Sequence, residues 1–310
     1  MRAISKAFSP AGISSFFEIC DQTPDGRTIR NLENAGARGG GFVITKGVET
    51  TVEVAKKGKN SIAVSINGKL AYQARTSLHV AEMLLAKTKE KYQILISHNC
   101  EVPIGAGFGS SAAGALGAAL ALSDAIGLKL TYNELGRIAH TAEIECKTGL
   151  GTVGPIMLGG CILTVEPGGP GIGVIDRLPL SPDHFIVAGT FEPMPTKKLL
   201  LSSPEKREKI NCCGNRTLKA ILEEPSIENF LLKCQEFAEE TGFMTQRTRA
   251  LMKAAEDAGA IGATQNMVGE AVHALTRLKN VESVAEAFKK VLPEEGVITA
   301  GIDFQGARLL

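Results

Sequence analysis

Three glycines at alternate positions, followed by two serines, form the part of the chain best suited to bind an anion. The stretch 103–113 reads Pro-Ile-Gly-Ala-Gly-Phe-Gly-Ser-Ser-Ala-Ala. Glycine permits backbone conformations and close ligand approach that a Cβ atom forbids. The run from Ala112 to Ile126 is rich in Ala, Leu and Gly and precedes Gly127, which predicts a helix. A glycine-rich turn running into a helix directs unpaired N–H groups at one place and therefore predicts an anion site.

The glycines alone are also compatible with a tight turn that feeds a close-packed helix. The stretch differs from the G-x-x-x-x-G-K-[ST] loop because no lysine precedes the serines, and its third glycine comes one place too early for G-x-G-x-x-G. The helix that follows is apolar on almost every face, which predicts that it is buried.

The order of glycine-rich turn, two serines and small-residue helix resembles the phosphate loop of the GHMP small-molecule kinases, a superfamily that includes galactokinase, homoserine kinase and mevalonate kinase. The resemblance implies that the loop binds the phosphates of ATP. The residues that it assigns to nucleotide binding are Pro103, Gly105, Ala106, Gly107, Phe108, Gly109, Ser110, Ser111 and Ala112.

A second helix is expected to begin after Thr131, which forms an S/T-x-x-E capping box with Glu134, and to run to about Lys147. Glu143 lies at the edge of its apolar stripe, where a carboxylate can reach into a cleft; a solvated helix acid is the alternative. The resemblance implies that Ser111 and Glu143 are catalytic and together hold Mg²⁺, a cation that prefers oxygen ligands.

Two further motifs are similar to those of the archaeal pantoate kinases within this superfamily. They are S-P-A-G-I-S at 9–14 and Q-N-M-x-G-E-A-V at 265–272. This resemblance implies ATP-dependent phosphorylation of pantoate to 4-phosphopantoate in coenzyme A biosynthesis, with ATP and Mg²⁺ as cofactors. His140 matches a histidine that would face the substrate in that group and is a further catalytic candidate. The candidates for substrate binding are Arg38, His140, Lys147 and Thr152.

Thr152 departs from the family pattern. It lies in a second glycine-rich turn, 147–155, where many members carry an aspartate that accepts the proton of the substrate hydroxyl. A neutral threonine is no useful base near pH 7. Three outcomes are open: transfer by positioning and charge stabilisation without a base, proton uptake by Glu143 or His140, or a different reaction.

The function therefore has alternatives. One is a GHMP kinase for another small alcohol or acid, such as mevalonate, homoserine or a sugar. The other is a protein that keeps the fold and has non-kinase chemistry. The stretch 158–165, expected to be a strand, also has no basic residue near its end to bind a carboxylate. Lys197 and Lys198 lie in a loop that either reaches phosphate or is solvated.

Composition and charge are ordinary for a globular protein with a small-molecule substrate. The chain has 310 residues, a net charge of +1 and 44 % hydrophobic residues, which argues against nucleic-acid binding. Its most apolar segment, 112–126, is shorter than the ~20 residues that span a bilayer, and the N-terminus lacks the apolar core of a signal peptide. We expect a cytoplasmic protein with no membrane partner, with seven reduced cysteines; the resemblance also allows a homodimer.

The expected fold is α+β, with the two lobes of the GHMP kinases. Residues 1–178 would form the ATP-binding lobe, a mixed sheet around the buried helix, and residues 179–310 a lobe of helices on a smaller sheet. We expect turns near Ser9–Gly12 and Gly47 and a hairpin tip at Asn67–Gly68. Further helices are predicted over 77–91, 217–222, 226–241, 245–258, 267–278 and 283–292, and strands over 92–97, 185–190 and 297–304.

Overall fold

The computed structural model describes residues 2–23, 25–192, 203–267 and 269–310; Lys197 and Lys198 lie outside them. The strands are β1 (Arg2–Cys20), β2 (Gly36–Lys56), β3 (Ser61–Ile66), β4 (Lys69–Leu70), β5 (Tyr92–Cys100), β6 (Cys161–Glu166), β7 (Val174–Leu178), β8 (His184–Glu192), β9 (Gly262–Gln265), β10 (Glu270–Arg277), β11 (Val297–Gly301) and β12 (Arg308–Leu309). The helices are α1 (Arg75–Leu85), α2 (Ser110–Ala125), α3 (Tyr132–Glu145), α4 (Val153–Leu158), α6 (Pro204–Glu223), α7 (Ile227–Glu240), α8 (Gln246–Asp257) and α9 (Val281–Lys289).

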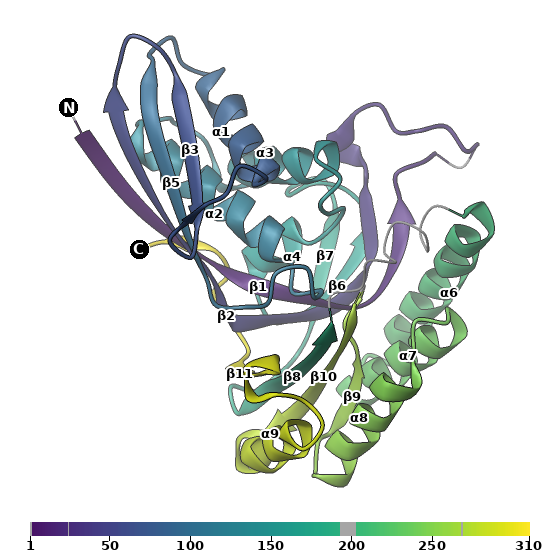
Figure 1. Cartoon of the computed structure of the whole chain (residues 1–310). Helices are drawn as coiled ribbons and strands as arrows, with labels where there is room; N and C mark the ends of the chain where they lie inside the picture. Colours follow the sequence, from purple (N-terminus) through teal and green to yellow (C-terminus); the bar gives the residue numbers. More distant parts are fainter. Residues whose placement is uncertain (1, 24, 193–202, 268) are drawn as a thin grey trace.

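Two sheets organise the chain, as the α+β prediction required (Figure 1). The eight-stranded sheet has the order β12-β1-β2-β5-β3-β4, with β6 paired to β2 and β7 to β6. The four-stranded sheet has the order β11-β8-β10-β9. The hairpin tip predicted at Asn67–Gly68 is confirmed, with φ angles of 49° and 77° that suit a tight two-residue turn.

The strands β1 and β2 form one long antiparallel ladder, so the turns predicted near Ser9–Gly12 and at Gly47 are wrong. Pro10 pairs with Gly47, and the next pair is Ala11 with Ile44, which leaves extra residues of β2 in a bulge. A bulge bends a strand without ending it and accommodates a proline. Pro10 and Gly47, on which the two turn predictions depended, therefore lie opposite each other, and both strands bend at this point.

The helix α2 is buried between the eight-stranded sheet and its neighbours α1 and α3, which confirms the predicted burial. Its glycines permit this packing, because a Cβ at Gly117 would lie 2.4 Å from Thr50 Oγ1. Beneath it, His98 forms hydrogen bonds of 2.9 Å with Thr50 Oγ1 and Ser77 Oγ. Burial lowers the pKa of His98 to about 4, so the ring is neutral in this polar contact between β2, β5 and α1.

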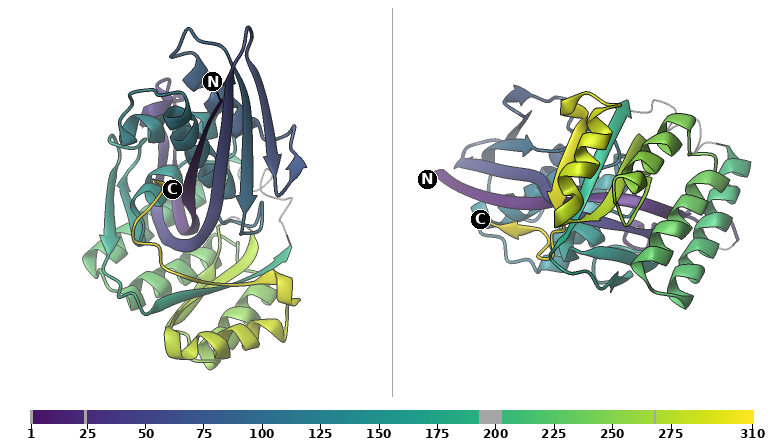
Figure 2. Two further views of the ribbon diagram at one scale, coloured as in Figure 1. Left: turned by 90° about the vertical axis from the view of Figure 1, so that its left-hand side faces the viewer. Right: turned by 90° about the horizontal axis from the view of Figure 1, so that it is seen from below.

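The four-stranded sheet is covered by α8 and α9 on the face turned away from the eight-stranded sheet (Figure 2). Its other face shares a core with β1 and β2, in which Phe42 and Phe230 stack edge to face at 5.4 Å between ring centroids. The helix predicted over 267–278 is wrong: these residues contain β10, which is buried over nearly its whole length and pairs with β8 and β9.

The helix α6 begins at Pro204, well before the predicted Thr217. Its first two turns are polar and largely exposed, so the sequence shows no apolar stripe before Ile210. All seven cysteines are free thiols. Among the described residues, no helix combines the length and apolarity needed to cross a bilayer. The division of the chain at residue 178 stays a prediction.

Candidate functional site

The glycine-rich loop joins β5 to α2 and requires its glycines. Gly105, Gly107 and Gly109 have φ angles of +82°, +81° and +61°, a region that residues with a Cβ rarely adopt. The residues between them point inward, since Ala106 and Phe108 are each only 1 % exposed. The loop is therefore anchored by its side chains and presents its glycine backbone outward.

Three separate segments hold this loop in place. From β1, the Gly12 N–H donates to the carbonyl oxygen of Phe108 over 3.2 Å. From the start of α4, Thr152 packs so closely that its Cγ2 would lie 2.7 Å from a Cβ at Gly109. From the turn between β9 and β10, Asn266 Cβ would lie 3.1 Å from a Cβ at Gly107. The conformation of the loop thus depends on contacts that are distant in sequence.

The loop ends at an uncapped helix N-terminus. Gly109 is the N-cap residue of α2 in the left-handed conformation, and no side chain caps the helix. The first backbone bond of the helix runs from the Ala113 N–H to the Gly109 carbonyl oxygen, so the N–H groups before it have no partner within the helix. Together with the helix dipole, they provide the donors that an anion site needs.

Glu143 lies beside this helix end and is only 3 % exposed. Its Oε1 accepts hydrogen bonds from Ser111 Oγ at 2.7 Å and from Thr148 Oγ1 at 2.6 Å. A Cβ at Gly149 would lie 2.0 Å from Oε2, so this position of the carboxylate requires glycine there. Ser111 and Glu143 are the residues that the sequence motifs pair; Thr148 was not predicted, because its only signal is a hydroxyl residue before the first glycine of a turn.

The donor set at this point fits Mg²⁺. A hydroxyl oxygen and a carboxylate oxygen meet at the end of α2, and Mg²⁺ takes hard oxygen ligands, one or two of them from protein and the rest from phosphate and water. In the described part of the chain, no group of three or more His, Cys, Asp and Glu side chains could hold a metal. An ion bound largely by nucleotide phosphates needs no such group.

His140 makes different contacts from those predicted. The ring is 2 % exposed, and its Nε2 donates to the carbonyl oxygen of Ala35 over 2.9 Å. Burial lowers the pKa of His140. The contact of His140 with Ala35 therefore holds the segment 32–35 against α3, and its contact with substrate stays a prediction.

Among the described residues, no hydrogen bond or ion pair joins the remaining substrate-binding candidates to one another. Arg38 forms an ion pair with Glu18, with 2.7 Å between Nη2 and Oε2, and its side chain is 25 % exposed. Lys147 is exposed and has a φ of 57° in the turn after α3. Among these three, Thr152 is the residue with a contact to the glycine loop that the structure records.

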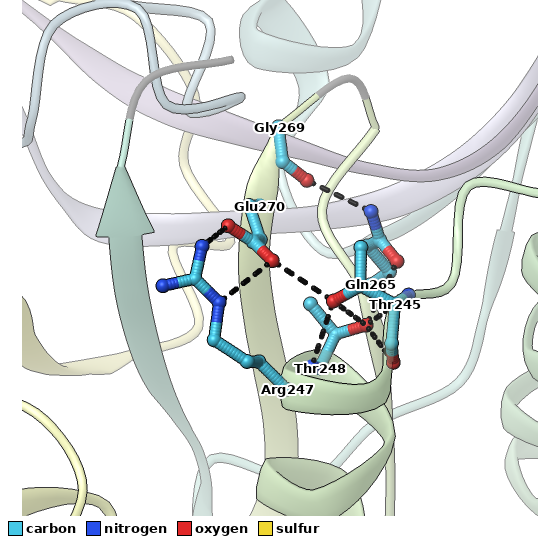
Figure 3. A network of polar contacts seen from close by, with 6 residues as sticks. All are labelled: Thr245, Arg247, Thr248, Gln265, Gly269 and Glu270. Atoms are coloured by element: carbon cyan, nitrogen blue, oxygen red, sulfur yellow. Dashed lines mark hydrogen bonds and ion pairs between the residues drawn. The ribbon is translucent and has the colours of Figure 1, made fainter.

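The turn between β9 and β10 contains part of the Q-N-M-x-G-E-A-V motif at 265–272. Its Met267 N–H donates to the carbonyl oxygen of Ser14 over 2.8 Å, which fixes the turn to β1 below the glycine loop. Within the motif, Gln265 Nε2 donates to the carbonyl oxygen of Gly269 over 2.8 Å (Figure 3). Glu270 forms an ion pair with Arg247 and accepts a hydrogen bond from Thr245 (Figure 3). These contacts brace the turn from the side of α8.

A buried polar chain crosses behind this turn. His273 Nε2 lies 2.9 Å from Ser15 Oγ on β1, and His273 Nδ1 lies 2.7 Å from Asn266 Oδ1. Burial lowers the pKa of His273 to about 3. The ring is therefore neutral, and its protonated nitrogen is the one that donates to the Asn266 carbonyl oxygen.

Known proteins are similar to this chain in sequence and in fold. The model of the GHMP kinases N terminal domain matches residues 74–160, which include the glycine loop and Glu143. The pantoate kinase of Thermococcus kodakarensis is 30 % identical over 286 residues, covering 91 % of this chain and 90 % of that protein. The pantoate kinase of Methanocaldococcus jannaschii is 29 % identical over 288 residues, covering 91 % and 96 %. A solved structure described as a phosphotransferase related to the CoA biosynthesis pathway superposes with a TM-score of 0.87 at 28 % identity, covering 99 % of this chain and 98 % of that one.

Proposed function

Because the chain belongs to the GHMP kinase family, and within it to the pantoate kinases, we propose that this ATP-dependent kinase phosphorylates pantoate to 4-phosphopantoate, a step of coenzyme A biosynthesis. The observation that carries the proposal is the contact of Ser111 with Glu143 at the uncapped start of α2. It combines backbone donors for phosphate with oxygen ligands for a metal at one point.

On the phosphate side, the loop from Pro103 to Ala112 would bind the nucleotide. The backbone at Gly105, Gly107 and Gly109 is exposed to a ligand, and the N–H groups at the start of α2 face the same place. Ser111 and Glu143 would hold Mg²⁺, which neutralises charge on the phosphoryl group that is transferred. The protein's own contribution is to fix these two oxygens relative to the loop.

On the acceptor side, we propose that no side-chain base takes part. Thr152 is neutral at the position next to Gly109, and His140 is buried, with its Nε2 donating to the carbonyl oxygen of Ala35. Phosphoryl transfer proceeds through a loose transition state, in which positioning and charge stabilisation supply most of the acceleration. The threonine is then compatible with kinase activity.

Arg38 is our candidate for the carboxylate of pantoate. Glu18 holds its guanidinium at a fixed place on β2 and raises the pKa of Arg38 through this hydrogen bond. A planar guanidinium binds a carboxylate through two parallel hydrogen bonds. A cytoplasmic location, independence from nucleic acid and membranes, and a homodimer are further proposals that follow from the family.

The test measures ADP release from Mg-ATP with pantoate, homoserine, mevalonate or no acceptor, for the wild type and Glu143→Gln. We expect ADP release that depends on pantoate and is lost in the variant, with 4-phosphopantoate identified by mass spectrometry. Release with another acceptor in place of pantoate would overturn the substrate assignment. No release with any acceptor would overturn the pantoate kinase proposal and favour altered chemistry.

A further inference from the structure

Thr148, a residue outside the predicted site, joins a chain of hydroxyl groups that ends on Glu143. Its Oγ1 lies 2.6 Å from Glu143 Oε1 and 2.9 Å from the Oγ1 of Thr76. Ser111 Oγ reaches the same carboxylate oxygen from the other side, at 2.7 Å. Three hydroxyl groups from three segments of the chain therefore form one continuous set of hydrogen bonds around this carboxylate.

The direction of these bonds follows from the number of hydrogens. Each hydroxyl has one hydrogen to donate, and a carboxylate only accepts. The hydrogen of Thr148 is directed to Glu143, so the hydroxyl of Thr76 donates to Thr148. Ser111 likewise donates to Glu143, which leaves its oxygen lone pairs as the part that can bind a cation.

Two helix ends meet at this set of bonds. Thr76 lies in the first turn of α1, and Ser111 lies in the first turn of α2. Neither helix has a side-chain cap, because Ala74 and Gly109 occupy the N-cap positions. The positive ends of two helix dipoles are therefore directed at the region of one carboxylate, and both favour its negative charge.

The main chain of Thr148 is bonded to Glu143, although Thr148 itself is an exposed residue. The Thr148 N–H donates to the carbonyl oxygen of Glu143 over 2.9 Å, which closes the turn after α3. The bare Cα of Gly149 borders the other carboxylate oxygen. Main-chain and side-chain contacts from two consecutive residues thus hold Glu143 in one orientation.

We infer that Thr148 is a positioning residue that fixes the Glu143 carboxylate for Mg²⁺ of the bound nucleotide, with Thr76 orienting the Thr148 hydroxyl. The inference rests on the proposed function, since it assigns the metal to Ser111 and Glu143. Groups that hold a ligand side chain in place contribute about ten- to a hundredfold in metal affinity.

The experiment compares Thr148→Val, Thr148→Ser and Thr76→Val with the wild type. Binding of a non-hydrolysable ATP analogue is measured by titration calorimetry at a series of Mg²⁺ concentrations and also without Mg²⁺. We expect Thr148→Val to raise the half-saturating Mg²⁺ concentration about ten- to a hundredfold while metal-free nucleotide affinity is unchanged. Thr148→Ser keeps the hydroxyl and is expected within about threefold of the wild type, and Thr76→Val between the two.

Two results would overturn the inference. One is a Thr148→Val variant with wild-type Mg²⁺ dependence; the other is equal weakening of nucleotide binding with and without Mg²⁺, which marks a structural role. Thermal melting verifies folding, and Thr148→Ala replaces the valine variant where that one does not fold. Wild-type protein that binds Mg-nucleotide and phosphorylates no pantoate would contradict the proposed function alone, so the two failures are distinguishable.

Discussion

The two sides of the site are built differently. On the phosphate side, Ser111 at the end of the glycine loop is hydrogen-bonded to Glu143, and the loop is held by contacts with Gly12, Thr152 and Asn266. On the acceptor side, Thr152 contacts the loop through a methyl group, His140 is bonded to backbone, and Arg38 is paired with Glu18. The first side is a preorganised set of donors and ligands, and the second is neutral or already paired.

This difference indicates which side of the site contributes more to the reaction rate. Interactions that stabilise developing charge are worth most where they are fixed before the reaction. The structure fixes such groups at the proposed phosphate site, so substitutions there are expected to affect the rate far more than substitutions beside the acceptor. Substitutions on the two sides of the site test this asymmetry.

Glu143→Gln should have the largest effect. Loss of the carboxylate charge removes the metal ligand and leaves two hydroxyl donors beside an amide, so we expect kcat to fall by about a thousandfold. Glu145→Gln is the matched control, because Glu145 lies two residues further along α3 and pairs with His79. Steady-state kinetics of both variants decide the point, and equal losses would contradict the assignment.

Gly109→Ala is expected to come next. An alanine at a φ of +61° is strained, and its Cβ would lie 2.7 Å from Thr152 Cγ2. Strain and overpacking together cost about 3 kcal/mol, or about a hundredfold in kcat/KM for ATP. Gly105→Ala has the same strain with no atom within 4 Å of the new Cβ, and we expect about a tenfold loss there. An equal loss in both variants would show that the contact with Thr152 is unimportant.

Acid should weaken the fold before it changes the chemistry. The pKa values of His98 and His273 are lowered by burial to about 4 and about 3, below the value of about 6.5 in an unfolded chain. The unfolded state therefore binds more protons below about pH 6.5, and stability is lost as the pH falls.

We expect the free energy of unfolding to drop by about 2 kcal/mol between about pH 6.5 and about pH 5.5, roughly half from each histidine. Denaturant melts at these two pH values measure the change. Activity per folded molecule should stay nearly constant over the same range, because the proposed mechanism uses no histidine as a base. A change of kcat with pH in this interval, at a constant folded fraction, would show that a histidine takes part in the reaction and would contradict the proposed difference between the two sides.

The smallest effect is expected at Thr152. Thr152→Val keeps the shape next to Gly109 and removes the hydroxyl, and we expect kcat within about twofold of the wild type. Thr152→Asp supplies a carboxylate base, and we expect less than about a threefold change in kcat with a higher KM for ATP from charge repulsion. A tenfold gain in kcat for the aspartate variant would show that a base is needed, and would contradict the proposal for the acceptor side.

The phosphate side could be predicted from sequence because its signals are local. The glycines of the loop, the small residues of α2 and the capping box at Thr131 each depend on neighbours a few residues apart, and the structure has the helices and the capping box as predicted. Ser111 and Glu143 were paired through a resemblance, and the structure brings them into contact.

The other elements depend on contacts between distant residues. Glu18 and Arg38 meet across two strands, and His140 bonds to a carbonyl 105 residues away in sequence. The strand β10 contains Ala, Leu and Glu, which favour a helix, and it forms a strand because β8 and β9 pair with it on both sides. Tertiary pairing overrides local propensity at such positions.

The paired bend at Pro10 and Gly47 has a consequence for motion. The strands β1 and β2 continue through it without a break, and on β1 Ala7 before the bend belongs to one hydrophobic core while Ala11 and Ile13 after it belong to another. Rotation of one half of the molecule against the other would have to flex a backbone ladder that both halves share. We therefore expect ATP and the acceptor to enter and leave the proposed active site through movement of loops, while the ladder of β1 and β2 keeps its shape.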